Sequence, residues 1–328
     1  GPVYTMNKYS PPRAFTSTIA PVFFDSIYTT FLYGINASQM IISLTSPDLD
    51  VTIFAPTNEG LAEGGIRYFK EGERIEYKAE DGLWNPMGEL AIKSYVSDQI
   101  TLDNNVDFSG SGFIKMNSGN YVQYNNNVLR GGGNQELGNQ AKITGSKEGD
   151  NGILYFVDKA ILGPKNDAAR FIANDNDLSE FYNLLFQAGL ADTTINPETD
   201  LGYPQMSFLQ LEESWTVFAP TNSAINTARA NGLIPEDIEK LKEFLLYHFV
   251  FDNVIFNDGK LGGNFLTAKI DSMGVDEVFY APVEVVNHSN NLRVVDRKGN
   301  NVNVNNGTAN NLIQLGVLHK IDNVLLEK

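Results

Sequence analysis

The chain has 328 residues, of which 42% are hydrophobic and 20% are charged, so it is long enough for about two domains with packed cores. Acidic residues number 40 against 24 basic ones, and the formal net charge of −16 repels phosphate backbones and anionic lipid headgroups. We therefore expect no nucleic-acid partner, whereas cations, basic proteins and neutral glycans stay open. The absence of cysteine excludes disulfides, thiol nucleophiles and thiolate metal sites.

The N-terminal region contains no signal peptide and no uninterrupted apolar run of the ~18 residues that cross a bilayer. Its most apolar stretch, residues 19–42, is interrupted by Pro21 and Asp25. The opening Gly1-Pro2 is typical of a protease-cleavage scar, so residues 1–14 are expected to be an N-terminal extension or such a scar. We hold open that an export signal or a lipid anchor was removed upstream of it.

The chain repeats itself. Residues 51–61 read VTIFAPTNEGL and residues 215–225 read WTVFAPTNSAI, so Phe54 and Phe218 align 164 residues apart. The segments GILYFVDKAIL at 152–162 and GVLHKIDNVLL at 316–326 align at the same offset. Two separated matches at one offset indicate a duplicated domain.

A weaker match between the two copies has a different offset, which indicates an insertion. AIKSYVSDQ at 91–99 corresponds to LLYHFVFDN at 245–253, and the offset there is 154. The first copy therefore carries about ten extra residues before this point, and we expect them in the polar segment 67–88. A Gly-Pro pair breaks regular structure at residues 163–164, so the two domains are expected at residues 15–163 and 164–328.

In both copies an alternating apolar segment runs into Ala-Pro-Thr-Asn, which is typical of a strand that ends in a helix start. Proline ends the strand, and the threonine hydroxyl is placed to cap the next helix. The asparagine is expected to hydrogen-bond the backbone of the turn. We therefore interpret these residues as a structural motif and not as active loops: Phe54, Pro56, Thr57, Asn58, Phe218, Pro220, Thr221 and Asn222.

Further elements follow the same frame. Residues 177–189 predict a helix that begins with a capping box of Asp177 and Glu180, and Pro235 is expected to open another. Residues 121–124 with 128–129, and residues 292–295 with 302–304, predict hairpins. Helices early and strands late in each copy predict an α+β domain built on an antiparallel sheet.

Three ordered motifs resemble the fasciclin-like domain: FAPTN after a strand, Tyr-His at the end of a helix, and the closing GVLHKIDNVLL. The second copy follows the pattern throughout, whereas the first has Ser94 in place of His248 and Tyr155 in place of His319. The resemblance covers the chain from about Phe15. It implies two tandem α+β domains, each a wedge-shaped antiparallel β sandwich with helices along one edge.

The resemblance also implies a non-catalytic module for adhesion or binding, extracellular or on the cell surface, with a surface or matrix protein or a glycan as partner and with no cofactor. In animal members, integrin binding is associated with the Tyr-His region and with an acidic Asp-Ile motif. Here the second position reads Asn311-Leu312, without the acidic group. We therefore expect a bacterial surface lipoprotein on the outer envelope.

The Tyr-His pair contains two candidate contact residues. His248 falls on an apolar stripe with Leu241 and Leu245, so we expect a core residue whose ring nitrogens are bonded internally. Tyr247 points away from that stripe and is expected on an exposed face, where an amphipathic ring suits an interface. His319 alternates with apolar residues on one strand face and is interpreted as structural.

The insertion supplies the other contact candidates, Tyr68, Tyr77 and Trp84, because aromatic platforms suit protein surfaces and sugar rings. With Tyr247 and His248 they complete the predicted binding set. The run Asn174–Asp177 suggests calcium, but the full twelve-residue loop is missing and helix capping explains it, so no metal site is predicted. The chain contains no G-x-S-x-G or H-E-x-x-H motif, and no catalytic residue is predicted.

Two other function classes stay open. The 40 acidic residues allow an acidic glycan-processing enzyme, whose paired carboxylates would lie ~5–10 Å apart across a cleft. Alternatively, the two domains form a structural spacer that positions another component on the cell envelope.

Overall fold

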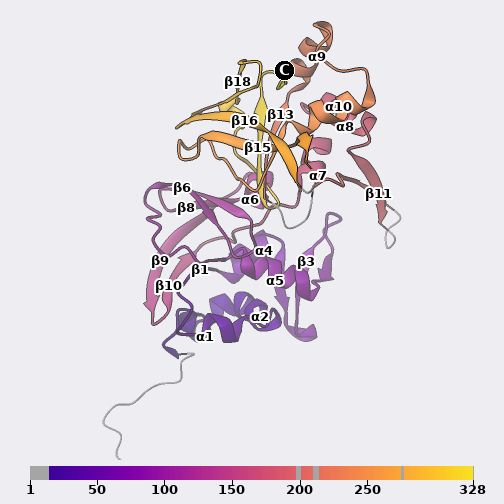
Figure 1. Ribbon diagram of the computed structural model, residues 1–328. Helices are drawn as coiled ribbons and strands as arrows, with labels where there is room; N and C mark the ends of the chain where they lie inside the picture. Colours follow the sequence, from indigo (N-terminus) through magenta and orange to yellow (C-terminus); the bar gives the residue numbers. More distant parts are fainter. Residues whose placement is uncertain (1–14, 197–200, 210–213, 275–276, 328) are drawn as a thin grey trace, which may run out of the picture. The chain divides into compact units, whose positions relative to one another are not determined.

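The computed structural model describes residues 15–196, 201–209, 214–274 and 277–327 (Figure 1). The chain divides into two compact units, Gly1–Gly163 and Pro164–Lys328. Each unit combines helices with a large sheet, so the fold is α+β. Within the described ranges, every helix is too short or too polar to cross a bilayer.

The first unit begins with helices and ends with strands. Its helical elements are α1 (Ala20–Phe24), η2 (Ser26–Tyr28), α2 (Thr29–Ala37), α3 (Ile41–Leu44), α4 (Asn58–Glu63), η3 (Lys70–Gly72), α5 (Glu89–Ser97) and α6 (Gly132–Leu137). Its strands are β1 (Val51–Pro56), β2 (Ile66–Phe69), β3 (Arg74–Lys78), β4 (Trp84–Pro86), β5 (Ile100–Thr101), β6 (Ser111–Lys115), β7 (Tyr121–Asn125), β8 (Val128–Gly131), β9 (Ala141–Gly149) and β10 (Gly152–Val157). The large sheet has the order β5-β1-β10-β9-β8-β7-β6, and β2, β3 and β4 form a separate small sheet.

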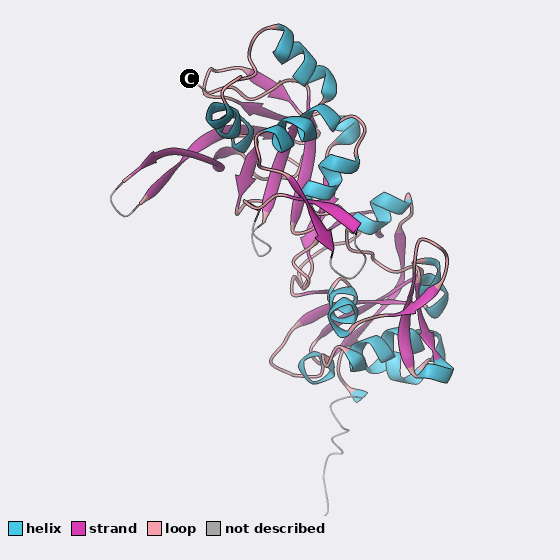
Figure 2. Cartoon of the chain, turned by 90° about the vertical axis from the view of Figure 1, so that its right-hand side faces the viewer, coloured by secondary structure: helices cyan, strands magenta, loops and turns pink. Residues whose placement is uncertain are grey.

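The second unit repeats this plan without the small sheet of the insertion. Its helical elements are α7 (Ala168–Asn174), α8 (Ser179–Gln187), α9 (Asn222–Ala230), α10 (Ile238–Leu246) and η4 (Asn306–Thr308). Its strands are β11 (Asp192–Asn196), β12 (Leu201–Gln205), β13 (Trp215–Pro220), β14 (Phe249–Phe251), β15 (Gly263–Met273), β16 (Val278–His288), β17 (Asn291–Val295), β18 (Asn301–Asn303), β19 (Asn311–Ile313) and β20 (Gly316–Ile321). The large sheet has the order β18-β17-β16-β15-β14-β13-β20-β19, and β15 and β16 extend from it as a two-stranded ribbon (Figure 2).

The sheet of each unit is packed on both faces. One apolar cluster lies between the helices and the sheet, for example Phe31 and Ile35 of α2 against Ile53 of β1. A second cluster contains Phe54 of β1 with Leu129 of β8, so the later strands fold back over the first strand. The second unit has the same two layers of apolar contacts.

One strand of each unit pairs in parallel with the last strand of that unit: β1 with β10, and β13 with β20, in the same register. Val51 lies opposite Gly152, and Trp215 lies opposite Gly316. A Cβ on Gly152 would lie 1.9 Å from the carbonyl oxygen of Val51, and one on Gly316 would lie 2.2 Å from that of Trp215. Only glycine therefore fits where β10 begins beside β1 and where β20 begins beside β13. The prediction of an antiparallel sheet is wrong for this pair, because the two strands run in the same direction.

Two predicted helix starts also differ from the structure. Helix α8 begins at Ser179 without a side-chain cap, so the predicted capping box of Asp177 and Glu180 is wrong. The carboxylate of Asp177 instead lies 3.5 Å from the ammonium of Lys320. Helix α10 begins three residues after Pro235, because the Asp237 side chain accepts a hydrogen bond from the Lys240 N–H at 3.0 Å. The predicted hairpins form as β7–β8 and β17–β18.

Candidate functional site

The Ala-Pro-Thr-Asn turns are structural in both units. The Thr57 hydroxyl accepts from the Gly60 N–H at 3.0 Å, and the Thr221 hydroxyl accepts from the Ala224 N–H at 3.2 Å. These bonds cap α4 and α9 as the sequence predicts. Pro56 and Pro220 are the last residues of β1 and β13.

The asparagine of each turn hydrogen-bonds to the backbone at the start of an earlier helix, not of the helix that follows the turn. Asn58 accepts from the Thr30 N–H and donates to the Ser26 carbonyl, each at 2.8 Å. Asn222 makes the same pair of bonds, with the Glu180 N–H and the Asn176 carbonyl, also at 2.8 Å. The expected bond to the turn's own backbone is therefore wrong. Each asparagine instead holds the first turn of a helix that precedes it by many residues.

His248 is fully buried and makes two internal hydrogen bonds. Its Nδ1 lies 3.0 Å from the Phe244 carbonyl, and its Nε2 accepts from the Leu325 N–H at 3.0 Å. This arrangement requires the neutral ring with the proton on Nδ1. Burial lowers the pKa of His248 to about 4. His248 therefore ties the end of α10 to the C-terminal segment and lies out of reach of a surface partner.

His319 is buried in a similar way. Its Nε2 lies 2.8 Å from the Ile255 carbonyl, its Nδ1 accepts from the Asn310 N–H at 3.3 Å, and burial lowers its pKa to about 4. Its ring stacks on Phe218 at 5.8 Å between centroids, as Tyr155 stacks on Phe54 at 5.7 Å. The position thus holds a planar ring against β1 in the first unit and against β13 in the second.

Tyr247 does not lie on an exposed face, so that prediction is wrong. The residue is 1% exposed, and its hydroxyl donates to the Pro282 carbonyl at 3.1 Å. Helix α10 ends at Leu246, and Tyr247 is its C-cap. Its ring packs with Val283 and Val285 of β16 in the second core cluster. Tyr247 is therefore a core residue.

The aromatic candidates of the insertion lie on two faces of the small sheet. Tyr68 pairs with Ile75 across β2 and β3, and Tyr77 pairs with Ile66, so all four share one face. Trp84 pairs with Lys78 and therefore lies on the opposite face. The three aromatic contact candidates of the insertion, Tyr68, Tyr77 and Trp84, therefore do not form a single aromatic surface.

On the face of the small sheet that carries Trp84, the charged and aromatic side chains contact one another. The carboxylate of Glu76 is 3% exposed and receives Arg67 at 2.7 Å and Arg74 at 2.8 Å. Hydrogen bonds from Arg67 hold the pKa of Glu76 below its usual range. The Arg67 guanidinium also lies 4.3 Å from the Trp84 ring centroid. Trp84 therefore has an internal partner.

The opposite face adjoins an open cleft of about 610 Å³. Tyr33 of α2 stacks on Tyr68 with 3.7 Å between ring centroids, and Tyr33 is 40% exposed. A hydrogen bond to Tyr33 raises the pKa of Tyr68 to about 12. The rest of the lining is polar: Thr29, Thr30, Asn58, Arg67, Lys70 and Glu73. We call this hollow the tyrosine cleft. The sequence did not indicate Tyr33, because α2 lies far from the insertion along the chain.

The sequence also did not indicate the one buried carboxylate with a raised pKa among the described residues, that of Asp98. Asp98 is 6% exposed and accepts from Ser118 and Asn120, while burial raises its pKa to about 6. Its surroundings close it off from a substrate, so its shifted pKa does not by itself indicate catalysis. In the acidic run 174–177, the carboxylates of Asp175 and Asp177 form ion pairs with the Lys320 ammonium, at 2.7 and 3.5 Å. Among the described residues, no cluster of three metal-ligating side chains occurs.

Two comparisons with known proteins bear on the fold, one over most of the chain and one over the second unit. Among solved structures, the chain is similar to a FAS1 domain pair from the insect cell adhesion molecule fasciclin I. That match has 14% sequence identity and a TM-score of 0.36, and it covers 92% of this chain and 97% of the other. The family called Fasciclin domain matches residues 176–327. The matched residues include every element of the second unit from α8 to β20, so the resemblance to a fasciclin domain is shown for this part of the chain.

Proposed function

We propose that this chain is a non-catalytic module for adhesion or binding, extracellular or on the cell surface, that contacts proteins or glycans. Fasciclin domains are generally found in cell adhesion proteins, which supports this role for residues 176–327. In this proposal residues 15–163 are a second, divergent fasciclin-like domain of the same wedge-shaped build. The parallel pairing of β1 with β10, in the register of β13 with β20, supports that duplication. A bacterial outer envelope, with a lipid anchor upstream, is the setting that we propose.

The tyrosine cleft is the observation that carries a contact role for the first unit. An aromatic face binds the apolar side of a sugar or a protein side chain, while hydroxyl and amide groups fix its orientation. Tyr33 offers a ring that is 40% exposed, and Thr29 and Lys70 stand beside it. The cleft involves the β2–β4 insertion, so it distinguishes the first unit from the second. We therefore propose it as the contact surface.

A glycan array probed with the purified chain, together with purified envelope proteins, tests this role. Tyr33→Ala should abolish or weaken binding at least tenfold, because it removes the exposed ring. Tyr77→Ala is the matched control, since Tyr77 is 43% exposed on the same small sheet and does not line the cleft. Equal binding by both variants would place the contact elsewhere. A folded chain that binds neither glycans nor envelope proteins would contradict the proposed function itself.

A further inference from the structure

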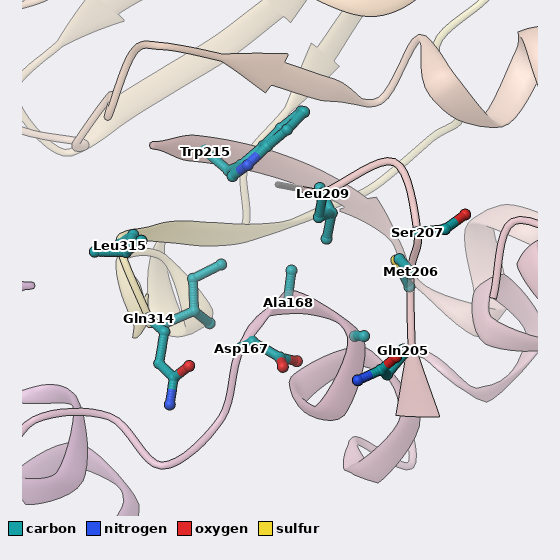
Figure 3. Close-up of a pocket in the computed structure, with 11 residues that line it drawn as sticks. Asp167, Ala168, Gln205, Met206, Ser207, Leu209, Trp215, Gln314 and Leu315 are labelled. Carbon is teal, nitrogen blue, oxygen red and sulfur yellow. The ribbon is translucent and has the colours of Figure 1, made fainter. Parts of the chain in front are cut away.

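The second unit contains a pocket of about 260 Å³ with an apolar floor and a polar mouth (Figure 3). The floor is formed by Ala168 and Ala169 of α7 with Met206, Trp215 and Ile313, all of which are buried. The mouth carries the side chains of Asp167, Gln205, Ser207 and Gln314. The pocket lining as a whole comes from four separate segments, which the fold of the second unit brings together.

The indole of Trp215 is the feature of this pocket that points to a ligand. Trp215 is 6% exposed, and among the described residues its Nε1–H finds no hydrogen-bond acceptor. Phe208 and Phe251 hold the ring edge-on, at 6.2 and 6.3 Å between centroids. In Figure 3 the nitrogen lies on the edge of the ring that faces the other lining residues. A buried donor without an acceptor is unfavourable, so a ligand oxygen at this position would be stabilising.

We propose that this pocket binds an N-acetylated sugar residue. An acetamido group has a methyl, which suits the floor formed by Ala168 and Ile313, and a carbonyl oxygen, which accepts from the Trp215 indole. The sugar hydroxyls then lie at the mouth, within reach of amide and carboxylate groups such as those of Gln205 and Asp167. The volume lies below the ~300–1,000 Å³ of pockets for drug-sized ligands, which suits one sugar residue.

Charge favours a neutral ligand over an anionic one. The chain has a formal net charge of −16, and Asp167 is the charged group at the mouth among the lining residues. A fatty acid or a phosphate ester would bring a further negative charge to this position.

The indole N–H of Trp215 is shielded from solvent, so a lining side chain must turn aside before a ligand acceptor reaches it. Met206 lines the pocket, and its unbranched side chain has the freedom for such a movement.

The two tryptophans allow a direct test by NMR. The chain contains one in each unit, Trp84 and Trp215, so a ¹⁵N-labelled sample gives two indole signals, which Trp84→Phe assigns. Titration with N-acetylglucosamine or N-acetylgalactosamine should move the Trp215 indole proton downfield with millimolar saturation. Glucose, which lacks the acetamido group, should leave it in place. Octanoate tests the alternative of a fatty acyl ligand.

Two variants test the geometry by calorimetry. Trp215→Phe keeps an aromatic ring but removes the N–H, and should weaken sugar binding at least fivefold. Ala168→Leu fills the floor and should abolish binding even if Trp215→Phe fails to fold, whereas Leu261→Ala, outside the pocket, should have no effect. The proposal is overturned if N-acetylated sugars leave the Trp215 signal unmoved, if glucose or octanoate moves it equally, or if folded Ala168→Leu still binds. Such a failure leaves the proposed function intact, because the tyrosine cleft belongs to the first unit.

Discussion

The two units should respond to acid in opposite directions. The second unit holds His248 and His319, fully buried and neutral, whereas the first unit contains no histidine and holds the buried carboxyl of Asp98. Burial lowers the pKa of both histidines to about 4 and raises the pKa of Asp98 to about 6. A group whose pKa differs between the folded and unfolded states makes the free energy of unfolding depend on pH.

For the histidines, the unfolded chain binds the proton more tightly, with a pKa of 6.5 against about 4 when folded. Their contribution is complete above pH 6.5 and is lost as the pH falls from there through 4. Between about pH 7.5 and about pH 5, each histidine should cost the second unit about 2 kcal/mol of unfolding free energy, so together about 4 kcal/mol. At His248 the pKa of about 4 already includes the opposing effect of the nearby Asp296 carboxylate.

For Asp98 the sign is reversed, because its pKa rises from 3.8 in the unfolded chain to about 6 in the folded one. The folded first unit takes up a proton at a higher pH than the unfolded chain does. It should therefore gain about 1.4 kcal/mol over the same interval of pH, as far as Asp98 is concerned.

Urea unfolding followed by tryptophan fluorescence separates the two responses. Trp84→Phe leaves Trp215 as the reporter of the second unit, and Trp215→Phe leaves Trp84 as the reporter of the first. His319→Gln retains a donor for the Ile255 carbonyl and should remove about half of the acid sensitivity of the second unit. If the second unit is as stable at pH 5 as at pH 7.5, or if His319→Gln leaves its pH profile unchanged, the reasoning from burial is refuted.

Three sets of substitutions test the structural motif, the closing strand and the insertion. Asn222→Ala should lower the unfolding free energy of the second unit by about 1–2 kcal/mol, because it leaves the first turn of α8 without its acceptor. Asn58→Ala should lower the unfolding free energy of the first unit in the same way. Unchanged midpoints of urea unfolding would contradict this reasoning. Gly316→Ala should prevent stable folding of the second unit, whereas Gly88→Ala should be tolerated, because its added methyl meets no atom within 4 Å. Circular dichroism distinguishes the two outcomes. A folded Gly316→Ala variant would refute the close contact at Trp215. Glu76→Gln should lower the melting temperature of the first unit and shift the Trp84 emission, because Arg67 loses its anion beside the indole; an unchanged emission maximum would show that the ion pair does not position the guanidinium.

The sequence predicted the features that depend on local chemistry. The threonine caps follow from strand, proline and hydroxyl in sequence, and the burial of His248 follows from the helical stripe. The position of Tyr247 did not follow, because its hydroxyl bonds to Pro282 on a strand that comes later in the chain. The tyrosine cleft and the Trp215 pocket were missed for the same reason. Each is assembled from segments whose proximity only the fold determines.

The parallel pairing of β13 with β20 has a consequence for synthesis at the ribosome. In the second unit, β13 lies between β14 and β20, and all six of its residues are buried. Until Gly316–Ile321 has been translated, that apolar strand has an open edge on which another nascent chain can add. Premature termination shortly before residue 316 should therefore yield an aggregating fragment, because the segment that closes the sheet is made well after β13.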